Sequence, residues 1–104
     1  MRIIIMFDMP VETYSQQVEY RKFHKNLIRN GFLMMQYSVY TRYCHNEVEV
    51  TKYVNIMNKI KPKEGEVRIL KITDIQYNNM IILNGTRKYR EELEAHNPRL
   101  FEID

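Results

Sequence analysis

Asp8 is the residue with which this chain could most directly do chemistry, because an apolar run delivers its carboxylate into a turn. Ile3–Phe7 are apolar at every position, and Asp8-Met9-Pro10 ends the run. Mg²⁺ prefers oxygen ligands, and one or two carboxylates can hold it together with waters and a substrate phosphate. A metal bound there could activate water or polarise a phosphoryl oxygen. Asp8 is therefore the candidate metal ligand and catalytic residue, with Mg²⁺ as the cofactor.

A second interpretation of Asp8 needs no metal. An aspartate in a turn accepts hydrogen bonds from nearby backbone N–H groups, and Asp8 stands just before Pro10. One aspartate per chain is a sparse metal site, whereas a two-fold axis near the first strand would bring two Asp8 side chains together. The sequence leaves both interpretations open.

A row of cations marks one face of an expected helix. Arg21, Lys25 and Arg29 recur at every fourth residue, and Lys22 lies beside them. Such a face can neutralise several phosphates of a nucleic acid without contacting its bases. The alternative is an ordinary solvated face whose last cations oppose the helix dipole favourably. Weaker candidates for phosphate contact are Arg42, Arg87, Lys88 and Arg90.

Other chemistry has less support in the residues. The eight tyrosines and four phenylalanines could stack on RNA bases, but Phe23, Tyr37 and Tyr53 fall on faces predicted to be buried. Cys44 and His45 do not make a structural zinc site, because such a site needs four ligands and the other histidines are far away in the sequence.

The hydrophobic pattern predicts the elements that position these residues. Continuous apolar runs indicate strands buried on both faces, and apolar residues spaced three and four apart indicate amphipathic helices. The predicted strands are Ile3–Phe7, Phe32–Tyr40 and Glu66–Thr73, with Thr41–His45 as a bend or a further short strand. The predicted helices run from Thr13–Ser15 to Asn30-Gly31 and from Asn46 to Pro62, with a helical turn over 74–79. Their buried stripes contain Phe23 and Leu27, and Val50, Tyr53, Val54, Met57 and Ile60.

This order, β-α-β-β-α-β, predicts an α+β fold with the ferredoxin-like arrangement over residues 1–85. Both helices would cover one face of a single antiparallel sheet, and no residues of the domain remain for the other face. A second copy of the chain is the expected cover, which predicts a homodimer through the sheet face. The tail, 86–104, is expected to pair through a strand at Leu100–Ile103 with the partner subunit or another protein.

Composition sets the class of protein. A chain of 104 residues predicts one domain, and 44% hydrophobic with 28% charged residues is typical of globular proteins. The single cysteine indicates a reducing compartment. No apolar stretch approaches a membrane span, and no signal peptide is evident, so we expect a cytoplasmic protein without a membrane partner. A net charge of +3 permits nucleic-acid binding without demanding it.

Four stretches of the chain, in order, resemble one known family. They are Met6-Phe7-Asp8-Met9-Pro10, Arg21-Lys22-Phe23-x-x-x-Leu27 running to Gly31-Phe32, Gln36-Tyr37-Ser38-Val39-Tyr40, and Gly65–Leu70 followed by Thr73 and Gln76. Together they resemble the small CRISPR-associated adaptation proteins, the "Cas two" family, most closely the members that accompany type II systems. The resemblance covers essentially the whole chain.

The resemblance implies a function for the dimer. It implies a homodimer that bridges two dimers of the CRISPR integrase ("Cas one") and holds a short DNA duplex for insertion as a new spacer. Many members of the family are also described as metal-dependent endonucleases acting on RNA or DNA, with Mg²⁺ held by the aspartate that ends the first strand, here Asp8. Val11, Glu12 and Thr13 stand where members described as nucleases often carry basic residues.

Two rival functions remain at the level of sequence. One is a free-standing, toxin-like, metal-dependent ribonuclease of the same fold, which would need no integrase. The other is a ferredoxin-like regulatory domain that binds a small ligand, which would need a glycine-lined pocket at the dimer edge. The three glycines, Gly31, Gly65 and Gly85, all fall at predicted turns and give it little support.

Overall fold

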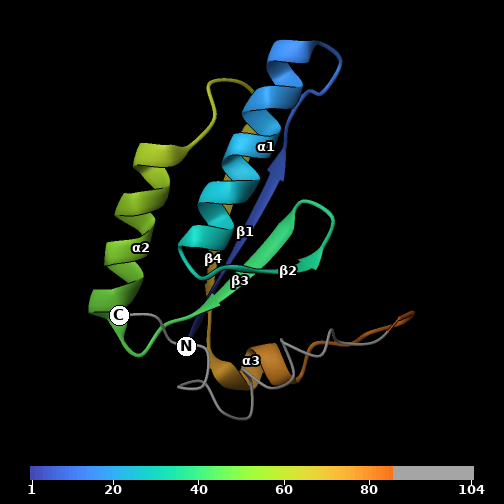
Figure 1. The fold of residues 1–104 in the computed structure, drawn as a ribbon. Helices are drawn as coiled ribbons and strands as arrows, with labels where there is room; N and C mark the ends of the chain where they lie inside the picture. The colour runs from blue at the N-terminus through green and yellow to red at the C-terminus, as the bar shows by residue number, and fades with distance from the viewer. Residues whose placement is uncertain (86–104) are drawn as a thin grey trace.

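A computed structural model describes residues 1–85 of the chain and shows an α+β fold with the ferredoxin-like arrangement (Figure 1). The four strands form one antiparallel sheet in the order β2-β3-β1-β4. Their bounds are β1 Arg2–Asp8, β2 Leu33–Gln36, β3 Val39–Tyr43 and β4 Glu66–Ile72; the helices are α1 Tyr14–Arg29, α2 Glu47–Ile60 and α3 Asp74–Asn78. The predicted fold class is confirmed. The predicted tail strand Leu100–Ile103 and the candidate phosphate ligands Arg87, Lys88 and Arg90 lie outside the described residues.

The apolar run at the start of the chain forms the central strand, as its lack of alternation predicts. Ile3, Ile5 and Phe7 belong to the core under α1 and α2, while Ile4 and Met6 point to the opposite face of the sheet. β1 pairs with β3 on one side and β4 on the other. Every residue from Arg2 to Ile5 is buried, although only Ile3 and Ile5 belong to the core beneath the two helices.

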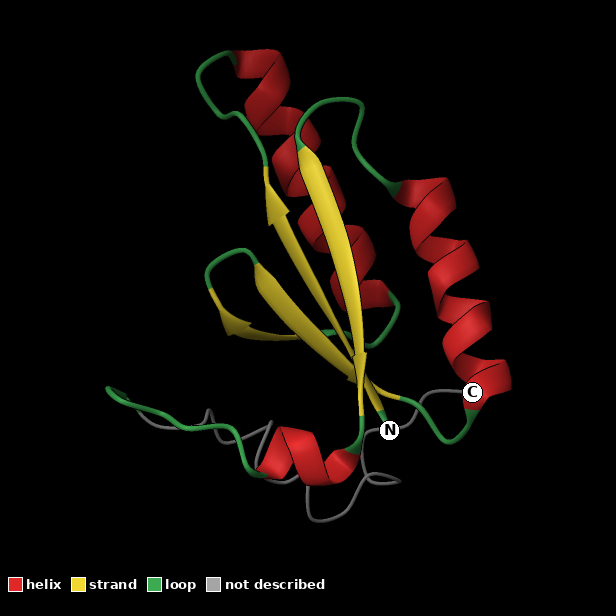
Figure 2. Cartoon of the chain, turned by 180° about the vertical axis from the view of Figure 1, so that it is seen from behind, coloured by secondary structure: helices red, strands yellow, loops and turns green. Residues whose placement is uncertain are grey.

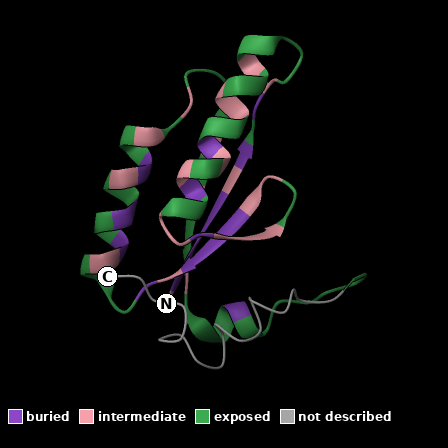
Figure 3. Ribbon diagram, viewed as in Figure 1, coloured by how far each residue is buried: buried purple, intermediate pink, exposed green. Residues whose placement is uncertain are grey.

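Both long helices cover the same face of the sheet (Figures 1 and 3). α1 begins with a capping box, in which Thr13 accepts a hydrogen bond from the Gln16 N–H and the Gln16 side chain accepts from the Thr13 N–H. The predicted core residues Phe23, Leu27, Val50, Tyr53 and Met57 are buried. The prediction for Val54 is wrong: it lies on the outer side of α2 and is 37% exposed, while Ile60 is half-buried.

The predicted strand Phe32–Tyr40 is wrong in one respect, because it contains a hairpin turn. Gln36 of β2 pairs with Val39 of β3, so Tyr37 and Ser38 form a two-residue loop. Ser38 adopts a φ of 64°, in the left-handed region, and an extended strand cannot continue through that conformation. The further strand considered at Thr41–His45 exists in part: Thr41–Tyr43 form the second half of β3, and Cys44 and His45 follow its end. Tyr37, predicted to be buried, is instead 71% exposed at the turn.

The second face of the sheet is partly covered by the chain itself. α3 begins with a capping box at Thr73 and buries Tyr77, whose ring lies 4.2 Å from Cζ of Arg2. The N-terminal amine pairs with the Asp74 carboxylate at 2.7 Å. We expected no residues of the domain to cover this face of the sheet. That expectation is wrong at the Arg2 end of β1, which α3 covers. Figure 2 shows that neither α1 nor α2 reaches this side of the sheet. No helix among residues 1–85 has the length and apolar character to cross a membrane.

Candidate nucleic-acid interface and carboxylate edge

Asp8 is the last residue of β1 and is exposed to solvent. Within residues 1–85 its carboxylate makes no hydrogen bond or ion pair, so the interpretation of Asp8 as a turn residue that binds nearby backbone N–H groups does not fit the structure. Asp8 pairs in register with Glu66 of β4. Cross-strand partners point to the same face, so the Asp8 and Glu66 carboxylates lie together at this end of the sheet, which we call the carboxylate edge. They line a hollow of about 220 Å³ with Met6, Phe7 and Arg68.

Gly65 allows β4 to pass close to the end of β1. Its φ is +99°, and a Cβ built on it would lie 2.4 Å from the Asp8 carbonyl oxygen and 3.1 Å from Cα of Met9. Both atoms belong to the backbone, so neither can rotate away. The glycine predicted at a turn is thus also the residue that sets the spacing between Asp8 and the incoming strand.

The chemistry of the two carboxylates suits Mg²⁺, but one chain supplies few ligands. Asp8 and Glu66 offer hard oxygen donors, and Glu66 also forms an exposed ion pair with Arg68 at 3.3 Å. Among residues 1–85 there is no group of three His, Cys, Asp or Glu side chains that could hold a metal. Sequence reasoning missed Glu66. The antiparallel register after Gly65 is the signal that could have found it.

All four predicted cations of α1 lie on the outer surface of that helix. Arg21, Lys22, Lys25 and Arg29 are exposed, and none of them forms an ion pair with another residue in the 1–85 range. Arg21, Lys25 and Arg29 follow one helix face, and with a rise of 1.5 Å per residue the row is about 12 Å long. Unpaired, closely spaced cations on a rigid helix are suited to consecutive phosphates of a nucleic-acid backbone.

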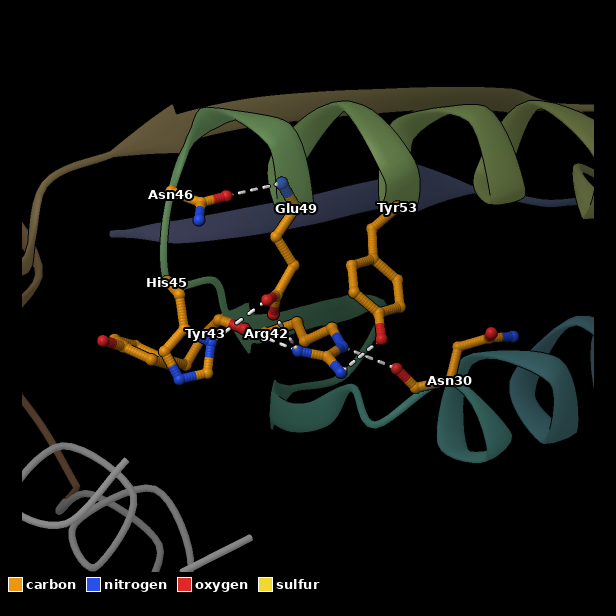
Figure 4. Close-up of polar contacts among 7 residues, drawn as sticks. All are labelled: Asn30, Arg42, Tyr43, His45, Asn46, Glu49 and Tyr53. Atoms are coloured by element: carbon orange, nitrogen blue, oxygen red, sulfur yellow. Dashed lines mark hydrogen bonds and ion pairs between the residues drawn. The ribbon is translucent and has the colours of Figure 1, made fainter. Parts of the chain in front are cut away.

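The structure removes Arg42 from the candidate phosphate ligands. Its side chain points into the fold between β3 and α2 (Figure 4), and the residue is 7% exposed. Nε donates to the Asn30 carbonyl at 2.8 Å, Nη1 donates to the Tyr43 carbonyl at 2.6 Å, and Nη1 pairs with Glu49 at 3.4 Å. Cζ also lies 3.7 Å from the centroid of the Tyr53 ring. Its charge makes Arg42 a candidate in the sequence, which does not reveal that these partners bind its guanidinium inside the fold.

A set of aromatic contacts extends from the core to the hairpin tip. Phe7 contacts Tyr40 with ring centroids 5.7 Å apart, and contacts Tyr20 at 6.1 Å. Tyr20 stacks on Tyr37 at 5.9 Å. His24 Nδ1 shares a hydrogen bond with the Tyr40 hydroxyl. Burial raises the pKa of Tyr40 to about 12 and is the largest cause of the raised pKa of Tyr20.

The remaining chemical candidates have structural roles. Cys44 is fully buried, and burial raises the pKa of its thiol to about 11. A thiol held protonated is a poor nucleophile and a poor metal ligand. His45 hydrogen-bonds Glu49 through Nδ1 at 3.0 Å.

Comparison with known proteins gives a consistent result across most of the chain. The family model described as "CRISPR associated protein Cas2" matches residues 1–80. A protein of Ligilactobacillus salivarius, named CRISPR-associated endoribonuclease Cas2, is 46% identical over 84% of this chain and 86% of its own length. A protein of the same name from Streptococcus mutans is 41% identical over 84% of this chain and 80% of its own length. Another, from Campylobacter jejuni, is 37% identical over 100% of this chain and 73% of its own length.

Proposed function

Because the chain belongs to the family of CRISPR-associated Cas2 proteins, we propose that it serves in CRISPR adaptation as a homodimer that binds duplex DNA. In this role it bridges dimers of the CRISPR integrase in the cytoplasm and holds the DNA that is inserted as a new spacer. The observation that carries the proposal is the row of exposed cations on α1, unpaired among residues 1–85. Neutralising phosphates without contacting bases suits a protein that must accept DNA of any sequence.

The second face of the sheet supports a dimer. Leu70 of the edge strand β4 is 50% exposed on this face, where it pairs with Ile4 of the central strand β1. Met6, Val39 and Ile72 are half-buried on the same face. A two-fold axis would place this apolar surface against its own copy. Leu70→Glu is therefore expected to shift the protein toward monomer in analytical ultracentrifugation. Val48→Glu changes an exposed apolar residue of α2, away from this sheet face, and should leave the association unchanged.

Titration of a fluorescent blunt DNA duplex over a range of salt concentrations tests the DNA-binding part. Each cation that contacts a phosphate contributes about 0.9 to the slope of log affinity against log salt. Lys25→Ala removes about one phosphate contact. It should therefore weaken the affinity and reduce the magnitude of this slope by about 0.9. Lys59→Ala on α2 removes an equal, exposed charge and should change neither. Equal losses for the two variants would show that net charge, and not the α1 row, determines binding.

A second candidate function is cleavage of RNA or DNA at the carboxylate edge. Two observations favour it: the relatives are named endoribonucleases, and the Asp8 carboxylate is exposed beside Glu66 with no partner among residues 1–85. These two residues would hold Mg²⁺, which supplies Lewis acidity toward a phosphate and an activated water. In a dimer, both copies of Asp8 could contribute. Loss of cleavage in Asp8→Asn, with duplex binding intact, would support this activity, and unchanged cleavage would refute it.

A further inference from the structure

Tyr37 presents a flat aromatic surface to solvent at the tip of the β2–β3 hairpin. Its side chain is 71% exposed, and one side of its ring lies against Tyr20, with the two planes 21° apart. Tyr20 in turn contacts Phe7 in the core. The exposed ring therefore has a rigid backing that most surface tyrosines lack. Tyr14 shows the contrast: it is 78% exposed on the same helix as Tyr20 and makes no ring contact with another residue in the described range.

The hairpin loop holds Tyr37 in place through a strained backbone at the next residue, Ser38. Ser38 is the only non-glycine residue with positive φ among residues 1–85, and a serine in that region is strained. Two-residue hairpin loops normally use glycine or asparagine for such a conformation. The Ser38 carbonyl accepts a hydrogen bond from the Phe7 N–H at 3.1 Å, which ties the tip to β1. Strain of this kind persists where the surroundings hold it, and it is concentrated at binding sites.

The stacked pair of Tyr37 and Tyr20 is joined to the cationic row through α1, because Tyr20 belongs to that helix. Arg21 follows Tyr20 directly in α1, and Lys25 is one turn further along. Resting on the proposed function, we propose that Tyr37, backed by Tyr20, is a stacking site for an unpaired base of DNA whose phosphates lie on the α1 cations. A base inside a duplex is covered on both faces by its neighbours, whereas a base in a single strand offers a free face to the ring.

Binding of a short oligothymidylate and of a long blunt duplex, measured side by side, tests the proposal. Tyr37→Leu should weaken oligothymidylate binding by about 5- to 30-fold, within the range for one base stacked on an aromatic ring, and should leave duplex binding unchanged. Tyr14→Leu, which removes an equally exposed tyrosine, should change neither. The chain has no tryptophan, so Tyr37→Trp creates a single reporter that keeps the stacking surface. Its affinity should match the wild type, and its emission should be quenched at saturating oligothymidylate.

The outcomes separate this proposal from the proposed function. If Tyr37→Leu and Tyr14→Leu bind oligothymidylate equally well, or if the emission of Tyr37→Trp does not change on binding, the stacking site is refuted while duplex binding stands. If neither polymer binds the wild-type protein, both proposals fail. Circular dichroism of each variant checks that the hairpin and the helices remain folded.

Discussion

Replacing Gly65 with alanine is the sharpest test of how the carboxylate edge is built. The new Cβ would lie 2.4 Å from the Asp8 carbonyl oxygen, well inside the contact distance, and the obstructing atoms are all backbone. The φ of +99° adds strain of about 1–3 kcal/mol for any residue with a side chain. Relief of the overlap requires β4 to move away from β1, which weakens the pairing of Glu66 with Asp8. We expect a total loss of about 2–4 kcal/mol in the free energy of unfolding.

Gly85→Ala is the matched control, because Gly85 has a similar φ of +94° but no atom within 4 Å of its would-be Cβ. It should show the backbone strain alone, about 1–2 kcal/mol and less than the total for Gly65→Ala. Urea unfolding at one fixed protein concentration compares the two variants with the wild type, since dimerisation would make stability concentration-dependent. Equal losses for Gly65→Ala and Gly85→Ala would refute the argument that close approach to Asp8 determines the need for glycine at 65.

Three further outcomes follow from the buried polar groups and the strained turn. Arg42→Ala should lower the free energy of unfolding by about 3 kcal/mol, because it leaves the Glu49 carboxylate and two backbone carbonyls without their donor. Arg68→Ala breaks an exposed ion pair and should lower the free energy of unfolding by about 0.5 kcal/mol or less in the same urea experiment. Burial raises the pKa of Tyr40 to about 12, so its contribution to the free energy of unfolding is complete below pH 10 and is lost as the pH rises from about 10 to about 12. Urea unfolding should show the free energy of unfolding fall by about 2 kcal/mol across this window because of Tyr40, and Tyr40→Phe should remove that part of the fall. Ser38→Gly should leave stability unchanged or raise it by up to about 1 kcal/mol, because relief of the left-handed strain offsets the added freedom of glycine, and a loss above about 1 kcal/mol would contradict the strain.

Much of the fold could be predicted because its signals are local. The unbroken apolar run of β1, the cap at Thr13 and the stop at Pro62 place three elements within a residue or two. The hairpin was misplaced because its loop, Tyr37-Ser38, lacks the glycine or asparagine that marks such turns. Ser38 is held in the left-handed region by tertiary contacts that no local pattern reveals.

The cationic part of the candidate site could be predicted because its residues all lie on one helix, α1. Arg21, Lys25 and Arg29 share a helix face, and helical spacing alone placed them at the surface together. Arg42 looked equivalent in the sequence, but its partners come from separate parts of the chain. Glu66 reaches Asp8 only through strand pairing across 58 residues of sequence. Contacts between distant segments are what the sequence pattern could not supply.

Integration of a short duplex into a CRISPR array by purified integrase is the most direct test of the proposed role in adaptation. The reaction is run with wild-type protein, with the α1 double variant Lys22→Ala/Lys25→Ala, with Asp8→Asn, and without the protein. We expect that omission abolishes integration, that the α1 variant impairs it while still forming the dimer, and that Asp8→Asn supports it at the wild-type level. Integration that proceeds equally well with the α1 variant, or without the protein, would contradict the proposed function.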